Sequence, residues 1–251
     1  MKKEKKIVKY EQEATSDNNY GISKEGKIIK VEASSKKSAT GRRIASVILW
    51  LLAIAAEVLG ILNIFGKVSL PDKFTKTTWL IILIVVDLIF FVIASLLWKK
   101  ANHIDPKSEK NKTTFWMWNN LGTILSVLAF LPIIIVVFTN KDMDKKSKGL
   151  VGGIAIVALL IAGISSYDFN PVSSEQLEAA RNEVLNVAGT DKVYWAPNSK
   201  KYHVDPDCPA FSQSETVYEG TVAAAYEKGL TDPCRRCIPE NHDHNDHNNE
   251  E

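Results

Sequence analysis

The chain has 251 residues, of which 45% are hydrophobic, and a formal net charge of +2. That length allows one or two domains. Apolar and charged residues are unevenly distributed along the chain. Long apolar runs fill the middle, while the chain from Asp168 onward has sixteen Asp/Glu against seven Lys/Arg. The C-terminal part therefore carries about −9 and the rest about +11. This distribution excludes an ordinary soluble protein and predicts an integral membrane protein with a soluble end.

Residues 1–43 are rich in lysine and poor in apolar side chains, without the apolar core of a secretory signal peptide. We expect a disordered basic arm. The segment Gly21 to Val31 could pair as a small hairpin, but nothing nearby offers it a core. A basic cluster next to the membrane is interpreted as a topology signal, with binding of anionic lipid as the alternative. It consists of Lys36, Lys37, Arg42 and Arg43.

Four apolar segments follow, each long enough to cross a hydrocarbon core of about 30 Å as a helix. Lipid offers no partners to free backbone groups, so the backbone there must be helical. The predicted four-helix transmembrane region, 44–167, has spans at about 44–64, 79–98, 116–138 and 150–167. Tryptophans lie mostly near the segment ends, as interfacial anchors do. They are Trp50, Trp79, Trp98, Trp116 and Trp118.

The orientation follows from the lysines and arginines of the loops. A basic N-terminal flank and five lysines between 99 and 112 place both of these segments in the cytoplasm, together with the C-terminal domain. The third loop has four lysines between 141 and 148, which opposes this orientation. A reducing cytoplasm also keeps thiols available to a metal ion. We therefore expect a multi-pass cell-membrane protein with both ends in the cytoplasm.

Two acidic residues lie inside the spans, Glu57 in the first and Asp87 in the second. A carboxylate at that depth costs several kcal/mol unless it is protonated or partnered, so both should face the bundle interior. We interpret them as a hydrogen-bonded polar pair between helices, with an ion or proton site as the alternative. Helix contacts should be aided by Asn119, Asn120 and Gly149-x3-Gly153. A homo-oligomer formed through the transmembrane helices is a further option.

After a short linker, residues 172–239 predict a small α/β domain. Ser173 and Gln176 form a capping-box pattern that starts a helix ending at Gly189. Strands and a second helix follow. They are expected at Lys192 to Ala196, Lys201 to Val204, Thr216 to Tyr218 and, for the helix, Thr221 to Lys228.

All three cysteines of the chain lie in this domain, next to one histidine at ligand spacing. The pattern is His203-x4-Cys208 followed by Cys234-x2-Cys237. An odd number of clustered cysteines argues against a disulfide framework. Two short turns that together supply one imidazole and three thiols are typical of a closed tetrahedral zinc site. The sequence predicts one structural zinc ion, with three unrelated thiols as the alternative.

The last residues, 240–251, are rich in histidine, aspartate and asparagine and too polar to fold alone. His242, His244 and His247 could bind divalent metals weakly. A solvated, disordered tail is the favoured interpretation.

The segment from Val193 to Ile238 resembles the Ada-type metal-binding domain, the zinc-bearing N-terminal module of a bacterial DNA-repair methyltransferase. The matching residues are Val193-Tyr194-Trp195, Lys201-Tyr202-His203, Cys208, Thr221-Val222-Ala223-Ala224-Ala225, Gly229 and Cys234-x-x-Cys237. The resemblance implies a small α/β fold with zinc on His203, Cys208, Cys234 and Cys237. In the repair protein the first ligand is a cysteine that accepts the methyl group. Here that position is His203, so the resemblance implies metal binding without alkyl transfer, as in accessory modules of other bacterial proteins.

Four protein ligands leave no open position on the metal, and no hydrolase or phosphate-loop motif is present, so we do not expect an enzyme. The acidic C-terminal part disfavours nucleic-acid binding, which remains a lesser alternative through Arg235-Arg236 and Lys200-Lys201. The sequence predicts a membrane-anchored protein that displays its zinc domain to an unidentified protein partner, for interaction or regulation. The alternative is a metal-responsive or transport-linked protein that uses Glu57, Asp87 and the His-rich tail.

Overall fold

The computed structural model describes residues 28–211, 214 and 216–239. The described residues form two compact units: one is Ser35–Ser174, and the other joins residues 28–34 to the described residues from Glu175 onward. The first is built from long apolar helices, and the second contains short strands and the His/Cys cluster. The predicted fold class, a membrane all-α region followed by a small C-terminal α/β domain, is confirmed.

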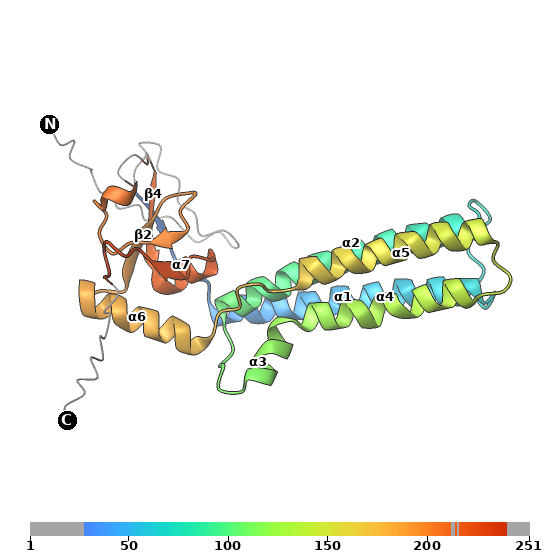
Figure 1. Ribbon diagram of the computed structural model, residues 1–251, viewed down its shortest axis with the longest axis horizontal. Coiled ribbons are helices and arrows are strands. Elements are labelled where there is room, and N and C mark those ends of the chain that lie inside the picture. The colour runs from blue at the N-terminus through green and yellow to red at the C-terminus, as the bar shows by residue number, and fades with distance from the viewer. Residues whose placement is uncertain (1–27, 212–213, 215, 240–251) are drawn as a thin grey trace, which may run out of the picture. The chain divides into compact units, whose positions relative to one another are not determined.

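The helical unit contains five helices among the described residues. They are α1 (Lys36–Ile64), α2 (Lys76–Ile104), α3 (Lys112–Asn119), α4 (Leu121–Thr139) and α5 (Lys145–Ser166). By length and composition, α1, α2, α4 and α5 could each cross a membrane. These four run alongside one another, with α1 against α2 and α4, and α5 against α2 and α4 (Figure 1).

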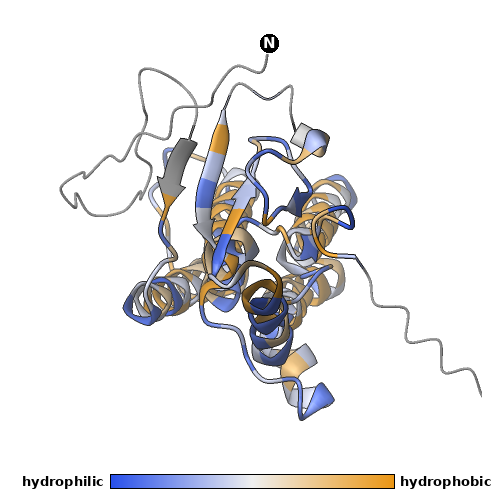
Figure 2. Cartoon of the chain, turned by 90° about the vertical axis from the view of Figure 1, so that its left-hand side faces the viewer, coloured by the Kyte–Doolittle hydropathy of each residue, from blue (hydrophilic) through white to orange (hydrophobic). Residues whose placement is uncertain are grey.

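Large apolar side chains cover the outside of this bundle as well as its interior. Leu51, Leu128 and Ile164 are all more than 60% exposed, whereas Phe91 and Phe130 are buried at its centre. The helices seen end-on in Figure 2 carry hydrophobic colour around much of their circumference. Helices that are apolar on all sides suit a hydrocarbon solvent, because water would penalise such a surface.

The first helix begins before the apolar segment does. Ser35 is its N-cap and accepts a hydrogen bond from the backbone N–H of Ser38. Within the same region, Arg43 Nη1 lies 2.8 Å from Asp105 Oδ2, and its guanidinium also contacts the ring of Trp118. The expectation that residues up to 43 are disordered is therefore wrong for the start of α1, because capping and this ion pair hold it.

The third predicted span, 116–138, is interrupted at Asn120. This residue has φ −106° and ψ 20°, so it ends α3 and precedes α4. Its side-chain N–H donates to the Trp116 carbonyl, and its Oδ1 accepts from the backbone N–H of Asp168. Trp116 thus belongs to α3, a separate helix outside the line of the bundle (Figure 1), and the spanning helix starts at Leu121.

The close helix contacts occur at glycines other than the predicted pair. A Cβ placed on Gly149 or Gly153 would meet nothing within 4 Å, so the predicted internal contact there is wrong. A Cβ on Gly122 would lie 2.8 Å from Ser95 Oγ and 3.0 Å from Ser166 Cβ. Helical period explains the difference, because residues 149 and 153 share the outer face of α5.

The second unit holds the remaining described elements. They are β1 (Ile28–Val31), α6 (Ser174–Ala188), β2 (Lys192–Trp195), β3 (Lys201–Tyr202), a 3-10 turn (Pro209–Phe211), β4 (Val217–Thr221), α7 (Val222–Glu227) and β5 (Asp232–Pro233). Strands β1, β4 and β2 form one sheet in that order, and β3 pairs with β5. Gly189 ends α6 with φ +67°, as predicted for a glycine C-cap.

Strand β1 joins this unit from the far end of the chain. It pairs in parallel with β4, with Ile28 opposite Val217 and Val31 opposite Gly220. The described part of the segment Gly21 to Val31, Ile28–Val31, therefore has its partner in β4. Residues 1–27 lie outside the described part of the chain.

Candidate metal centre

His203 is positioned by a short antiparallel bridge. Its backbone N–H donates to the Tyr194 carbonyl at 2.8 Å, and the Tyr194 N–H donates to the His203 carbonyl at 2.7 Å. The bridge joins β2 and β3, which lie within the two strands expected at Lys192 to Ala196 and Lys201 to Val204. Tyr202, the neighbouring residue, is fully buried and anchors β3 in the core. The imidazole is therefore attached to a fixed backbone.

Cys208 follows a tight turn after this hairpin. The backbone N–H of Asp207 donates to Asp205 Oδ1 at 2.8 Å, and that of Cys208 donates to the Asp205 carbonyl at 3.2 Å. An aspartate that binds the backbone two residues on stabilises such a turn. Pro209 then begins the 3-10 turn. The turn brings the Cys208 thiol back toward His203.

Cys234 and Cys237 lie on one knuckle after β5. The Cys234 N–H donates to the Tyr202 carbonyl at 2.8 Å, which fixes the knuckle beside the residue that precedes His203. The N–H groups of Cys237 and Ile238 both donate to the Cys234 carbonyl at 2.9 Å. Two residues between the cysteines let both thiols face the same point.

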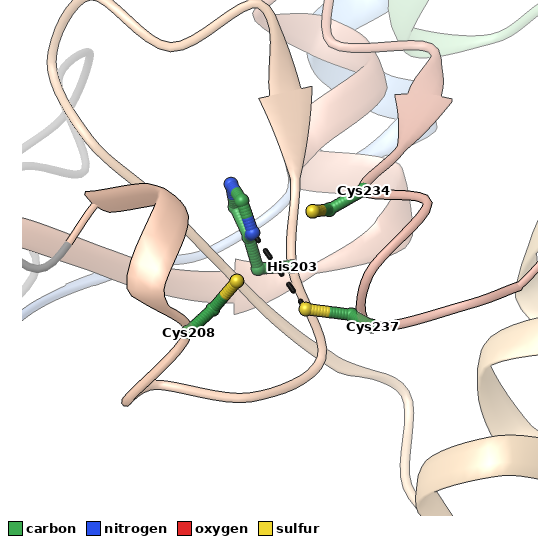
Figure 3. Close-up of side chains that lie close together, drawn as sticks. All are labelled: His203, Cys208, Cys234 and Cys237. Atoms are coloured by element: carbon green, nitrogen blue, oxygen red, sulfur yellow. Dashed lines mark hydrogen bonds between the residues drawn. The ribbon is translucent and has the colours of Figure 1, made fainter.

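These four side chains surround a common space, as Figure 3 shows. Their ligand atoms all lie within 4.8 Å of one another, and Cys237 Sγ lies 3.7 Å from His203 Nδ1. Zinc–sulfur bonds of about 2.3 Å and zinc–nitrogen bonds of about 2.1 Å give tetrahedral edges of about 3.6–3.8 Å. The donors therefore fit around one ion with little movement.

The surroundings of the cluster are apolar. His203, Cys208 and Cys234 are buried and Cys237 is half-buried. Cys208 and Cys234 pack with Ala196 and Val217 in one hydrophobic cluster. The three cysteines are free thiols rather than a disulfide. The cluster is thus part of the core of its unit.

Burial and local hydrogen bonds both shift the pKa values of the ligands. Burial lowers the pKa of His203, which favours the neutral imidazole that binds metals. Burial raises the pKa of the Cys237 thiol to about 12. For Cys234 burial acts in the same direction, but hydrogen bonds from the Arg236 and Cys237 backbone outweigh it and leave the pKa lowered. A bound cation would favour the thiolate at each cysteine.

The other predicted site residues lie elsewhere. Glu57 and Asp87 are buried in the helical unit. His242, His244 and His247 lie outside the described residues. Arg235 and Arg236 are exposed on the knuckle between the last two cysteines.

One supporting element was missed by sequence reasoning. Strand β1 completes the sheet whose strand β4 begins at Val217, a residue of the hydrophobic cluster around the cysteines. Its only local signal is the short run Ile28-Ile29-Lys30-Val31. The pairing partner is remote in the chain, so that run alone did not distinguish a domain strand from a disordered arm.

Comparison of the chain with protein-family models, with curated proteins and with solved structures finds no match.

Proposed function

We propose that this protein is a multi-pass membrane protein that holds one structural zinc ion in a small domain and presents that domain to a protein partner. The observation that carries the proposal is the convergence of His203, Cys208, Cys234 and Cys237 within 4.8 Å of one another. Nitrogen and sulfur donors in tetrahedral proximity are the preferred environment of zinc.

The zinc ion is structural rather than catalytic in this proposal. Four protein ligands complete the coordination shell, whereas catalytic zinc keeps a position open for water or substrate. The cluster also lies in the core of its unit, against Ala196 and Val217. We therefore assign no enzymatic role to it.

The resemblance to Ada-type metal-binding domains belongs to the same proposal. It is supported by the order of the elements, in which the His203 hairpin, β4, α7 and the Cys234 knuckle follow one another. With His203 in place of the methyl-accepting cysteine, the domain binds its metal without accepting alkyl groups. The role of the metal is then to stabilise the folded surface that the domain presents to its partner.

Both ends of the chain lie in the cytoplasm in this proposal. Strand β1 precedes the first membrane helix and β4 follows the last, and their pairing requires the two flanks to share one side. Four spans, an even number, meet that requirement. The basic N-terminal flank and the free thiols favour the cytoplasmic side.

A protein partner fits this domain better than nucleic acid does. From Asp168 onward acidic residues exceed basic ones by nine, and phosphate contacts depend on a basic surface. The hairpin turn at Pro197 and Asn198 is exposed, and Pro197 borders a hollow of about 320 Å³ that the half-buried Tyr218 also lines. Aromatic residues such as Tyr218 are enriched at protein contact sites.

The test uses the full-length protein in cells, with a photo-crosslinking residue at position 198. We expect a discrete protein adduct that is lost in Cys234→Ser, because that variant releases zinc and unfolds the domain. A crosslinker at the exposed loop residue Asp142 serves as the matched control. Adducts to nucleic acid alone, or adducts unchanged by Cys234→Ser, would contradict the proposal.

A further inference from the structure

Two acidic side chains lie buried inside the helical unit, far from the metal ligands in sequence. Glu57 on α1 is 5% exposed and Asp87 on α2 is 2% exposed, and these two helices pack against each other. In the part of the chain that the structure describes, Glu57 Oε1 and Asp87 Oδ1 have no hydrogen-bond partner. Asn119 and Asn120, which the sequence predicts to aid the helix contacts around the two acids, donate hydrogen bonds to backbone carbonyls of α3 instead.

Apolar layers enclose the acid pair along the bundle. One turn beyond Glu57, a Cβ on Gly60 would lie 3.5 Å from Ile133 Cδ1 and 3.6 Å from Leu80 Cδ2. In the other direction, the rings of Trp50 and Phe91 lie 6.2 Å apart, and Phe91 is one helical turn from Asp87. The carboxyl groups therefore lie between two hydrophobic layers, where a charge is poorly solvated.

Basic side chains on the packed helices lie far from the pair. Along α2, Lys76 and Lys99 are the nearest, about 16–18 Å from Asp87 at 1.5 Å per residue. On α1, Arg43 is about 21 Å from Glu57 along the helix and is paired with Asp105. Helix α4 carries no ionisable residue, and the lysines of α5 all lie in its first turn. No cationic side chain on these helices balances the two acids.

We propose that Glu57 and Asp87 form an intramembrane proton-binding site, in which the pair holds at least one proton in the folded protein at neutral pH. Two carboxylates without a cation are unfavourable inside an apolar bundle, and a proton removes one of the charges. A metal ion is disfavoured, because hard cations take about six oxygen ligands and this site offers two carboxyl groups among apolar neighbours.

Infrared spectroscopy of the full-length protein in lipid nanodiscs tests this inference. We expect wild type at neutral pH to show the C=O stretching band of a protonated carboxyl group. The double variant Glu57→Gln, Asp87→Asn should lose the band. The loop variant Asp142→Asn, which changes an exposed carboxylate, should keep it. Elution profile and helical circular dichroism should be the same for all three proteins.

Two results would overturn the inference. One is a wild-type spectrum without this band at neutral pH. The other is a band that disappears when sodium or calcium is added at constant pH, which would identify a metal ion as the ligand. If the double variant fails to fold, carbodiimide labelling of wild type decides, because the reagent modifies protonated carboxyl groups. Adducts on the peptides containing Glu57 or Asp87 support the site, and their absence contradicts it.

Discussion

Val31 and Gly220 lie opposite each other in a parallel ladder, although the four membrane helices separate them in the chain. A Cβ on Gly220 would lie 2.7 Å from the Val31 carbonyl oxygen and 2.6 Å from Trp195 Cη2. The glycine therefore permits β1 and the Trp195 ring to approach β4 at the same point. This contact ties the start of the chain to the domain that carries the metal ligands.

Replacing Gly220 with alanine should weaken that strand pairing. The added methyl group must displace a backbone oxygen as well as a ring, which typically costs about 1–3 kcal/mol. Hydrogen exchange of the peptides covering β1 and β4 should accelerate in Gly220→Ala. The control is Gly41→Ala, because a Cβ at Gly41 in α1 meets nothing within 4 Å. Equal protection in the two variants would show that β1 does not depend on this contact.

A second glycine substitution tests the packing of the membrane helices. Gly122→Ala should push apart Ser95 and Ser166, whose hydroxyl groups are hydrogen-bonded at 2.8 Å and buried. We expect a loss of about 1–3 kcal/mol, seen as a lower thermal midpoint in detergent. The control is Gly153→Ala, which has the same gain in helix propensity. Its added methyl group points into open space, so its thermal midpoint should not fall. A lower midpoint for Gly153→Ala alone would contradict the observed helix faces.

The start of α5 should depend on pH through its N-cap residue, Asp144. The Ser147 hydroxyl group, and then its backbone N–H at 3.0 Å, hold the pKa of Asp144 below its usual value. A lowered folded-state pKa means that the stabilisation is present above the unfolded value of about 3.9 and is lost as pH falls through the folded value. At pH 7, Asp144→Ala should therefore speed amide exchange in the first turn of α5.

The same variant should resemble wild type once Asp144 is protonated in the folded protein, at pH values below its lowered folded-state pKa. Asp144→Asn is the control, since asparagine retains a side-chain acceptor for the cap and loses only the charge. An Asp144→Ala protein with unchanged exchange at pH 7 would exclude the capping role.

The membrane helices could be predicted from the sequence because lipid offers no hydrogen-bond partners, so an apolar segment that crosses it must be helical. The long apolar runs around Leu51, Ile84 and Ile156 each became a helix. Helix ends were less predictable, because caps and ion pairs decide them. Ser35 starts α1 eight residues early, and Asn120 divides the third predicted span through contacts with Trp116 and Asp168.

The candidate metal centre could be predicted because ligand chemistry is local. The spacings within His203-x4-Cys208 and Cys234-x2-Cys237 fix two turns, and the structure brings the two turns together. The strand Ile28–Val31 could not be predicted in the same way. Its partner lies beyond the whole membrane region, and a four-residue run with three β-prone residues does not specify which edge it joins.

The central claim is that the four converging side chains hold one zinc ion, and elemental analysis of the purified full-length protein tests it most directly. We predict one zinc per chain in wild type, and less than one in Cys234→Ser and in His203→Ala. Wild-type protein that is folded, keeps its thiols reduced and contains no zinc would contradict the claim.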